Sequence, residues 1–412
     1  MSEGKDAGVV VLLATPTMTA RFLVGDVFDR LATLEDDSVD LVLTSPPFLA
    51  LRSYLPADHP DKHLEGGSQA TPGEFIDWLV DVVEALDRVL APHGSLVVEL
   101  GDTYAGSGGA GGDYNADGLR EGQPKFRQDN RDGWPLPKSL SLIPEIFRFT
   151  LVYGFNPLTQ RTTPQWRDRN NITWCRPNPP VGALGDKFRP GTSDLMVFCK
   201  SAKRFFDLDA VREPHKYAEA GLRRNGPGGM PLDDAGRPAA DGSQHLDGNA
   251  AGAPPLDWWQ IPTHPYKGSH YATFPPALCV RPIKAMCPER VCLVCGEPSR
   301  RITGEPEYVK PDGRQHGFHG DGWETNEAGA NRRIVTGVDN GNMTRVAPTL
   351  GWSDCGHDTW RPGHVLDPFA GTGTVLAVAT GHGRNATGID LDERNADLAL
   401  ERVGPLMLTV EP

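Results

Sequence analysis

The stretch that most restricts the fold is residues 364–374, where an apolar segment runs directly into a glycine-rich turn and then a predicted helix. Gly371 and Gly373 let backbone N–H groups approach a ligand closely at this turn. Asp390 comes 17 residues after Gly373, at the end of the next predicted strand, where its carboxylate is placed to accept hydrogen bonds from ribose hydroxyls. Together these residues favour a nucleotide-like cofactor site over an ordinary strand-to-helix turn.

Strands and helices alternate through the chain outside its Gly- and Pro-rich segments. Apolar runs predict strands, and apolar residues at helical spacing predict helices. We expect strands at 21–24, 38–44, 95–100, 171–175 and 194–199, and helices at 27–34, 72–90 and 140–153. Because such alternation builds a parallel sheet with helices on both faces, the sequence predicts an α/β fold with a doubly wound, mostly parallel sheet and loop insertions.

The overall charge argues against a nucleic-acid partner, but its distribution leaves room for one. The net charge is −13, whereas residues 161–224 hold thirteen Lys and Arg against seven Asp and Glu. Arg161, Arg167, Arg169 and Arg176 are candidates for phosphate contacts, and a solvated basic face is the equal alternative. Any DNA-binding face should therefore be local.

Cysteine usage and hydropathy indicate the compartment. Seven cysteines in 412 residues do not form a disulfide framework and indicate reducing conditions. The apolar run at residues 9–14 is too short, and its flanks too evenly charged, for a targeting signal. No stretch approaches the roughly twenty apolar residues of a membrane span. We therefore expect a cytoplasmic protein without membrane contact.

A second informative segment is residues 43–48, Leu-Thr-Ser-Pro-Pro-Phe, at the end of a predicted buried strand. Pro46 and Pro47 lack backbone donors and stiffen the loop, so that carbonyl oxygens stay free as acceptors. Ser45 adds a side-chain acceptor, and Phe48 adds a flat apolar face. Acceptors beside an aromatic ring suit an amino group on a base that is flipped out of a duplex. A surface Ser-Pro-Pro turn is the alternative, which the apolar strand before it disfavours.

Four residues at the two ends of a polar insertion form a candidate metal site. Cys292 and Cys295 make a tight Cys-Leu-Val-Cys-Gly knuckle, and Cys355 and His357 lie at the far end of the insertion. Three thiolates and an imidazole are a zinc ligand set, so we expect a structural zinc site. Reduced, unligated cysteines are the alternative, and Cys287 is a competing ligand. The remaining cysteines are assigned to the core: Cys175, Cys199 and Cys279.

In this order the two motifs resemble those of the permuted amino-methyltransferases of DNA, whose catalytic motif precedes the cofactor motif. Thr44-Ser-Pro-Pro-Phe48 is similar to their catalytic motif, and Asp367-Pro-Phe-Ala-Gly-Thr-Gly373 is similar to their S-adenosylmethionine motif. The serine form, preceded by Leu43, is associated with enzymes of cytosine N4, and Asp-Pro-Pro-Tyr is typical of many enzymes of adenine N6. Further similarity runs through residues 174–200 and 269–275.

The resemblance implies a Rossmann-like methyltransferase fold, S-adenosylmethionine as cofactor and double-stranded DNA as partner, with the target base flipped out. Catalysis is assigned to the serine motif: Ser45, Pro46, Pro47 and Phe48. Cofactor binding is assigned to the glycine-rich motif, the acidic residue after it and one histidine: Asp367, Pro368, Phe369, Ala370, Gly371, Gly373, Thr374, Asp390 and His270. For His270, an ordinary packed histidine is the equal alternative.

The permuted order also predicts neighbours in the sheet. At the switch point of a doubly wound sheet, the strand that ends in Asp367 should lie beside the strand that ends in Thr44. Residues 21–24 are expected beside the strand that ends in Asp390, which places Asp26 near the adenine end of the cofactor. The chain after Asp390 is too short to supply much more sheet.

These assignments divide one catalytic domain into segments. Residues 20–205 form the predicted catalytic half, and residues 267–286 and 361–412 form the cofactor-binding half. Residues 206–266, rich in Gly and Pro, are the predicted target-recognition segment, and Trp258-Trp259 within it is assigned to the core. Residues 287–360 are the polar insertion with the zinc knuckle.

The predicted reaction is site-specific methylation of an exocyclic amino group of DNA, with cytosine N4 favoured. Acceptors at Ser45 and the Pro46 carbonyl would make the amino nitrogen more tetrahedral and more nucleophilic. Methylation of cytosine C5 needs a nucleophilic cysteine, usually in a Pro-Cys pair, which this sequence lacks. The alternatives are adenine N6 methylation, a methyltransferase of RNA or of a protein amide, and a catalytically silent DNA-binding regulator. We expect a nucleoid-associated modification enzyme of a bacterial or phage-infected cell.

Overall fold

The computed structural model describes residues 18–50, 54–55, 58–106, 132–179, 185–213, 253–263, 275–304, 307–309, 322–325, 331–334, 344–346, 348–405 and 407–411. The predicted cofactor residue His270 and most of the predicted recognition segment 206–266 lie outside the described residues. The chain divides into two units: residues 1–207, 256–300 and 354–412 form the first, and residues 208–255 and 301–353 form the second.

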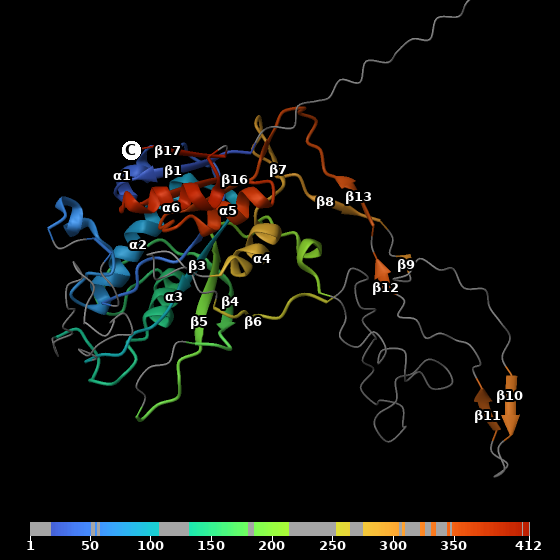
Figure 1. Cartoon of the computed structure of the whole chain (residues 1–412), viewed down its shortest axis with the longest axis horizontal. Coiled ribbons are helices and arrows are strands. Elements are labelled where there is room, and N and C mark those ends of the chain that lie inside the picture. The colour runs from blue at the N-terminus through green and yellow to red at the C-terminus, as the bar shows by residue number, and fades with distance from the viewer. Residues whose placement is uncertain are drawn as a thin grey trace, which may run out of the picture. The chain divides into compact units, whose positions relative to one another are not determined.

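Within the described part of the first unit, nine strands form one sheet in the order β17-β1-β16-β15-β2-β3-β5-β4-β6 (Figure 1). Along this order the strands span Leu408–Glu411, Ala20–Val24, Asn385–Asp390, His364–Asp367, Val39–Thr44, Leu90–Leu100, Thr192–Cys199, Arg167–Cys175 and Trp258–Gln260. The strands from β17 to β3 are parallel to one another. β5 is antiparallel to both β3 and β4, and β6 is parallel to β4. The predicted mostly parallel sheet is therefore confirmed.

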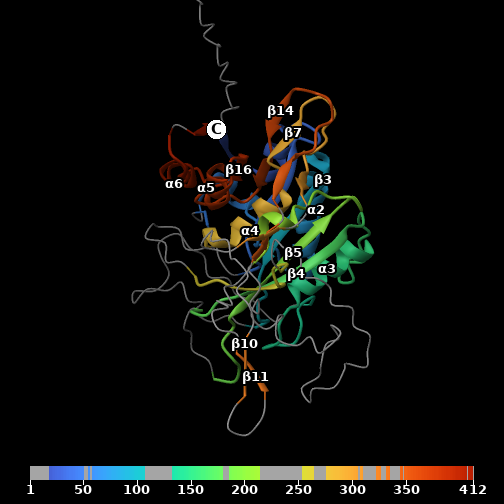
Figure 2. The same cartoon turned by 90° about the vertical axis from the view of Figure 1, so that its right-hand side faces the viewer.

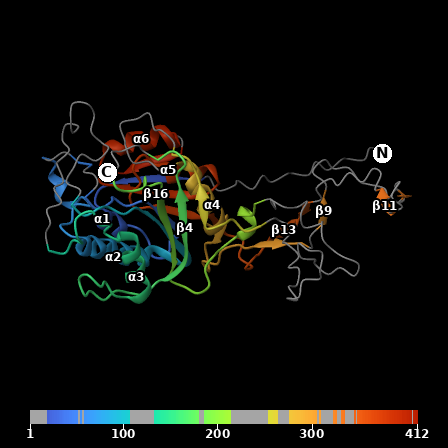
Figure 3. The ribbon, with the colours of Figure 1, turned by 90° about the horizontal axis from the view of Figure 1, so that it is seen from below.

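Helices cover both faces of this sheet. α1 (Val27–Ala32), α2 (Pro72–Val89) and α3 (Ile143–Tyr153) lie on one side, and α4 (Pro276–Met286), α5 (Thr374–Gly381) and α6 (Arg394–Val403) lie on the other (Figure 3). On each side, neighbouring helices pack against one another. The sheet is thus doubly wound, as the alternation of strands and helices predicted.

α2 illustrates how local sequence sets these elements. Thr71 caps the helix by accepting a hydrogen bond from a backbone N–H of the first turn (3.2 Å), and Pro72 begins it at a position that needs no donor. Its core-facing residues recur every three or four positions: Phe75, Ile76, Leu79, Val80, Val83 and Leu86. β3 begins directly after α2, at Leu90 and not at the predicted Ser95, because Pro92 favours extended backbone at the residue before it.

Both predicted pairs of neighbouring strands are present. β15 lies parallel to β2, so Asp367 and Thr44 end adjacent strands. β1 lies parallel to β16, and Val24 is opposite Asp390. The chain after Asp390 supplies one more edge strand, β17, which the sequence analysis did not predict because it is only four residues long.

The polar insertion joins the two units along the chain. In the second unit, the described residues form short antiparallel pairs: β8 (Arg301–Thr303) with β13 (Thr349–Trp352), β9 (Glu307–Val309) with β12 (Thr344–Val346), and β10 (Gly322–Thr325) with β11 (Asn331–Ile334). In the first unit, β7 (Arg290–Cys292) and β14 (Trp360–Pro362) pair with each other (Figure 2). Across the described ranges, no helix has the combined length and apolarity that crossing a membrane requires.

Candidate active site

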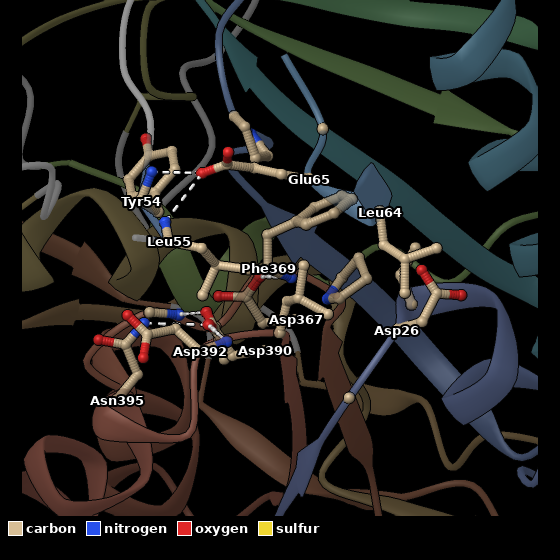
Figure 4. Close-up of a pocket in the computed structure, with 18 of the residues that line it drawn as sticks. Asp26, Tyr54, Leu55, Leu64, Glu65, Asp367, Phe369, Asp390, Asp392 and Asn395 are labelled. Carbon is tan, nitrogen blue, oxygen red and sulfur yellow. Dashed lines mark hydrogen bonds between the residues drawn. The ribbon is translucent and has the colours of Figure 1, made fainter. Parts of the chain in front are cut away.

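A pocket lies at the carboxyl ends of β1, β16, β15 and β2, the edge at which doubly wound sheets bind ligands. The empty space of this pocket, counted out through its open mouth and including open solvent, is about 920 Å³. Many of the predicted site residues line it: Asp26, Ser45, Pro47, Asp367, Pro368, Phe369, Ala370, Gly371, Thr374 and Asp390. Figure 4 shows Asp367 beside Phe369 near the centre of the view, with Asp390 on one side of them and Asp26 on the other.

Asp367, at the end of β15, is held by two hydrogen bonds to the same carboxylate oxygen. Thr44 Oγ1 donates to Oδ1 from the adjacent strand (2.7 Å), and the backbone N–H of Phe369 donates to it across the turn (3.1 Å). The residue is 2% exposed, and burial raises the pKa of its carboxyl to about 7, although the bond from Thr44 opposes this shift. A cationic group of a bound ligand would stabilise the charged form of this carboxylate.

The turn after Asp367 requires glycine at two positions. Gly371 (φ +48°) and Gly373 (φ +73°) adopt left-handed backbone conformations. A Cβ on Gly373 would lie 2.9 Å from the Cβ of Ala399 in α6, so the turn also packs too closely on α6 for a side chain. α5 begins directly after Gly373, and its first turn therefore points backbone donors toward the pocket edge.

Asp390 lines the pocket, and its carboxylate also holds the glycine-rich turn in place. Oδ2 accepts the N–H of Gly371 (2.7 Å), and Oδ1 accepts both the N–H of Asp392 (2.9 Å) and the Nδ2 of Asn395 (2.9 Å) (Figure 4). Burial raises the pKa of Asp390 to about 6, against the effect of these bonds. A carboxylate offers about four acceptor sites, so the three bonds from described residues leave one acceptor site for the ribose hydroxyl predicted from the sequence.

Other pocket residues fit the parts of a nucleoside cofactor. Thr372 lines the pocket, and its buried hydroxyl has no hydrogen-bond partner among the described residues. The rings of Phe369 and Trp78 lie 5.6 Å apart and form an apolar wall. Asp26 lines the pocket while its carboxylate caps α1 by accepting the N–H of Phe28 (2.9 Å). A free hydroxyl, an aromatic wall and carboxylates match the carboxylate, adenine and ribose of S-adenosylmethionine.

Several pocket residues were missed by the sequence analysis. Glu65 lies just after the 3-10 helix η1 (Pro60–Leu64) and is 5% exposed. Its carboxylate accepts the backbone N–H groups of Tyr54 and Leu55 and forms an ion pair with Lys62. Trp78 lies on the core-facing side of α2, where an aromatic residue indicates only packing. No local sequence signal distinguishes these residues, because long-range folding brings them to the pocket.

The serine motif follows β2, and its described residues include Ser45 and Pro47 in the pocket wall. Ser45 Oγ donates its hydrogen to Oε2 of Glu99 at 2.6 Å. A hydroxyl has one hydrogen and two lone pairs, so this bond leaves the Ser45 oxygen as an acceptor toward other partners. Phe48 packs on Gly101, where an added Cβ would lie 2.7 Å from the ring.

Glu99 near the end of β3 is a further site residue that the sequence analysis missed. It is 5% exposed, and burial raises its pKa, while hydrogen bonds with Ser45 and Ser193 and the charge of Arg176 lower it. Arg176 stacks over Trp174 and donates to Ser193 Oγ (3.0 Å). Its Nε is buried without a partner in the part of the chain that the structure describes. The available signal was the only acidic residue of β3, which stands in the apolar end of that strand.

The predicted phosphate-contacting arginines are engaged within the protein. Arg161 forms ion pairs with Asp81 (2.6 Å) and Glu84 (3.3 Å). Arg167 and Arg169 donate to backbone carbonyls just after β5, at 2.5 Å and 3.5 Å. These bonds give the basic stretch a structural role, and its contact with phosphates stays a prediction.

The core positions predicted for two tryptophans and three cysteines are confirmed only in part. Trp259 is 6% exposed, whereas Trp258 is 49% exposed, because successive residues of β6 face opposite sides of the strand. The core assignment of Trp258 is therefore wrong. Cys199 and Cys279 are fully buried, and Cys175 is only half-buried.

The four predicted metal ligands come together beside the β7–β14 pair. The ligand atoms of Cys292, Cys295, Cys355 and His357 all lie within 4.8 Å of one another, which is close enough to hold one metal ion. Cys287, the predicted competing ligand, is buried and does not belong to this group.

A known protein family matches more than half of this chain. The family described as DNA methylase, which comprises N6- and N4-type enzymes, matches residues 39–292 and 359–401. The chain is 29% identical to the type II methyltransferase M.XycI of Xanthomonas campestris pv. cyanopsidis over 69% of this chain and 83% of that protein. It is 32% identical to M.SfiI of Streptomyces fimbriatus over 50% of this chain, and this match spans only 42% of M.SfiI.

Solved structures give a weaker likeness. The PvuII DNA methyltransferase, which is cytosine-N4-specific, aligns with a TM-score of 0.46 and 13% identity over 96% of this chain and 95% of its own. A putative DNA modification methylase of Thermus thermophilus, complexed with S-adenosyl-L-methionine, aligns with a TM-score of 0.42 and 19% identity over 95% of this chain and 98% of its own.

Proposed function

We propose that this chain methylates cytosine at N4. It belongs to the DNA methylase family, whose members are S-adenosylmethionine-dependent enzymes that methylate the exocyclic amino group of a DNA base, either N4 of cytosine or N6 of adenine. The observation that carries this proposal is the hydrogen bond from Ser45 to Glu99, which leaves the Ser45 oxygen as an acceptor at the pocket wall. The serine form of the motif, which resembles that of cytosine-N4 enzymes, supports the choice of base.

Cofactor binding is assigned to the wall formed by β15, β16 and β1. Bound S-adenosylmethionine supplies an electrophilic methyl group on a sulfonium sulfur. Asp367 offers a buried carboxylate to the cationic amino group of the cofactor, and Thr372, whose hydroxyl has no partner among the described residues, offers that hydroxyl to the cofactor's carboxylate. Asp390 and Asp26 offer acceptors to the ribose and adenine end, and Phe369 offers a flat apolar face to the adenine.

Base activation is assigned to Ser45 and its support. The lone pair of an exocyclic amino group is delocalised into the ring, which makes the nitrogen a poor nucleophile. Acceptors at Ser45 and the Pro46 carbonyl would bind the two amino hydrogens and favour a tetrahedral nitrogen. The lone pair of this nitrogen would form the bond to the methyl carbon in line with the carbon–sulfur bond that breaks, and the methylated nitrogen would then release one of its hydrogens to solvent as a proton. Glu99 keeps the Ser45 hydrogen away from that nitrogen, so the serine accepts and does not donate.

Double-stranded DNA would present its target base flipped out of the stack. The amino group of a stacked cytosine is engaged in base pairing, whereas the Ser45 oxygen lies in the wall of a pocket. The names of the relatives, type II methyltransferases, support site-specific modification of the kind that protects DNA from a nuclease.

The test is methylation of unmethylated genomic DNA by the full chain with labelled S-adenosylmethionine, followed by mass spectrometry of the nucleosides. N4-methylcytosine is the expected product, and Ser45→Ala, which removes the acceptor but keeps the cofactor wall, is the matched control. N6-methyladenine would contradict the assignment of the base. The absence of any modified base, with cofactor binding retained, would contradict the proposed role of Ser45 and Glu99.

A further inference from the structure

We propose that Cys292, Cys295, Cys355 and His357 bind one structural zinc ion that closes the base of the polar insertion. The two pairs of ligands are separated by most of that insertion in the sequence, yet all four ligand atoms lie within 4.8 Å of one another. Thiolate and imidazole ligands in a group of four are the set that zinc prefers in closed structural sites.

The distances around His357 favour a metal ion over hydrogen bonds. Its Nδ1 lies 3.5 Å from Cys292 Sγ and 3.4 Å from Cys355 Sγ. With Zn–S near 2.3 Å and Zn–N near 2.0–2.1 Å, tetrahedral angles place a sulfur about 3.6 Å from the nitrogen. An imidazole nitrogen carries either one hydrogen or one lone pair, so it cannot form two well-directed bonds to two sulfurs. A metal ion among the three atoms accounts for both distances.

The backbone around the ligands is shaped as a metal knuckle. The N–H of Val294 donates to Cys292 Sγ (3.3 Å), which is the type of bond that stabilises a metal-bound thiolate. Gly296 (φ +70°) and Gly356 (φ +82°) adopt left-handed conformations next to Cys295 and Cys355. Each turn therefore bends sharply beside a ligand, so that both ligand pairs face one point.

The site is joined to the catalytic sheet but separate from the pocket. Trp360 of β14 lies opposite Cys292 of β7, and the next residue, Arg361, forms an ion pair with the buried Asp40 of β2 (2.6 Å). His364 starts β15 on this side, whereas the pocket residue Asp367 ends the same strand. Zinc would thus support the ends of the central strands β15 and β2 that lie away from the pocket.

The role of the ion follows from where the chain leaves the first unit. Residues 301–353 belong to the second unit, and the ligand pairs lie shortly before and after them in the sequence. Linking Cys295 to Cys355 closes a long loop, and a cross-link of this kind removes conformational entropy from the unfolded chain. All four positions are protein ligands, so the ion has a structural and not a catalytic role.

Metal content of the full chain tests the proposal. After purification without chelator and extensive dialysis, plasma mass spectrometry should find about one zinc per chain. Cys355→Ser should lower this content at least about five-fold, whereas Cys175→Ser, a half-buried cysteine outside the cluster, should retain it. Replacement by cobalt should give the visible absorption bands of a tetrahedral, thiolate-ligated ion.

Thiol titration keeps the test decisive if a variant fails to fold. In the wild type, chelator treatment should expose three further reactive thiols, and cofactor binding to the distant pocket should remain measurable. A wild-type protein without zinc, or a Cys355→Ser variant with unchanged zinc, would overturn the proposal. A mass lower by two hydrogens, which indicates a disulfide within the cluster, would overturn it as well.

Discussion

Ser45 Oγ donates a hydrogen bond of 2.6 Å to Oε2 of Glu99, a residue 54 positions away on the neighbouring strand. The bond fixes the only hydrogen of the Ser45 hydroxyl on a buried carboxylate. The acceptor character of Ser45 therefore depends on a residue outside its own motif.

The first prediction concerns this pair. Ser45→Ala should lower kcat by about 10²–10³-fold with little change in cofactor affinity, since it removes a bond that matters most in the transition state. Glu99→Ala should also lower kcat, because the Ser45 hydroxyl is then free to rotate. Glu99→Gln retains an acceptor oxygen and should recover part of the activity. Steady-state kinetics and cofactor binding measure these effects, and equal activity of Glu99→Ala and Glu99→Gln would exclude the positioning role.

The second prediction concerns the pH dependence of stability. The pKa of Asp367 is raised to about 7 in the folded protein, against about 3.9 in an unfolded chain. Its contribution to stability is therefore complete below about pH 4 and is lost as the pH rises through about 7. Asp367→Asn should gain stability relative to the wild type between pH 5 and pH 8.

Urea unfolding of the cofactor-free protein at these two pH values measures the effect. Asp397→Asn, at an exposed position of α6, is the control for simple loss of a negative charge. A difference between Asp367→Asn and the wild type that does not change with pH would contradict the assignment.

The third prediction concerns the glycine-rich turn. Gly373→Ala should destabilise the protein by about 1–2 kcal/mol, because it places a side chain at φ +73° and 2.9 Å from Ala399 Cβ. Gly381→Ala lies at the other end of α5, where an added Cβ meets no atom within 4 Å. This control should keep or raise the stability, by up to about 1 kcal/mol. Thermal unfolding distinguishes the two, and equal effects would refute the argument.

The fourth prediction concerns the buried charge of Asp40, which is fully buried and bonded to His93 (2.9 Å) and Arg361 (2.6 Å). Burial opposes ionisation, but these two partners hold the pKa of Asp40 below its ordinary value. Arg361→Met should cost about 3–5 kcal/mol at pH 7, because it leaves the carboxylate short of a partner. Since this stability is lost on protonation, the difference should shrink below about pH 4. Chemical unfolding of the wild type and of Arg361→Met at pH 7 and pH 3.5 measures this difference in stability. The same difference at both pH values would contradict the prediction.

Several features of this protein follow from the sequence by itself. The alternation of strands and helices, the glycine-rich turn after Asp367 and the serine motif after Thr44 each depend on residues that are close together in the chain. Backbone preferences and hydrophobic periodicity act over these short distances, which is why the doubly wound sheet and its two predicted strand pairs were foreseeable. The cysteine and histidine spacing likewise indicated which four residues to bring together.

Only the tertiary structure decided which side chains share a buried environment. Glu99 beside Ser45, Trp78 beside Phe369, and Arg361 beside Asp40 are joined by strand pairing and helix packing across long stretches of chain. The hydrogen-bonded partner of a buried polar group is set by sheet order and register, and neither has a local signature. The sequence therefore determined the elements and their motifs, and the packing of those elements determined the detailed chemistry of the site.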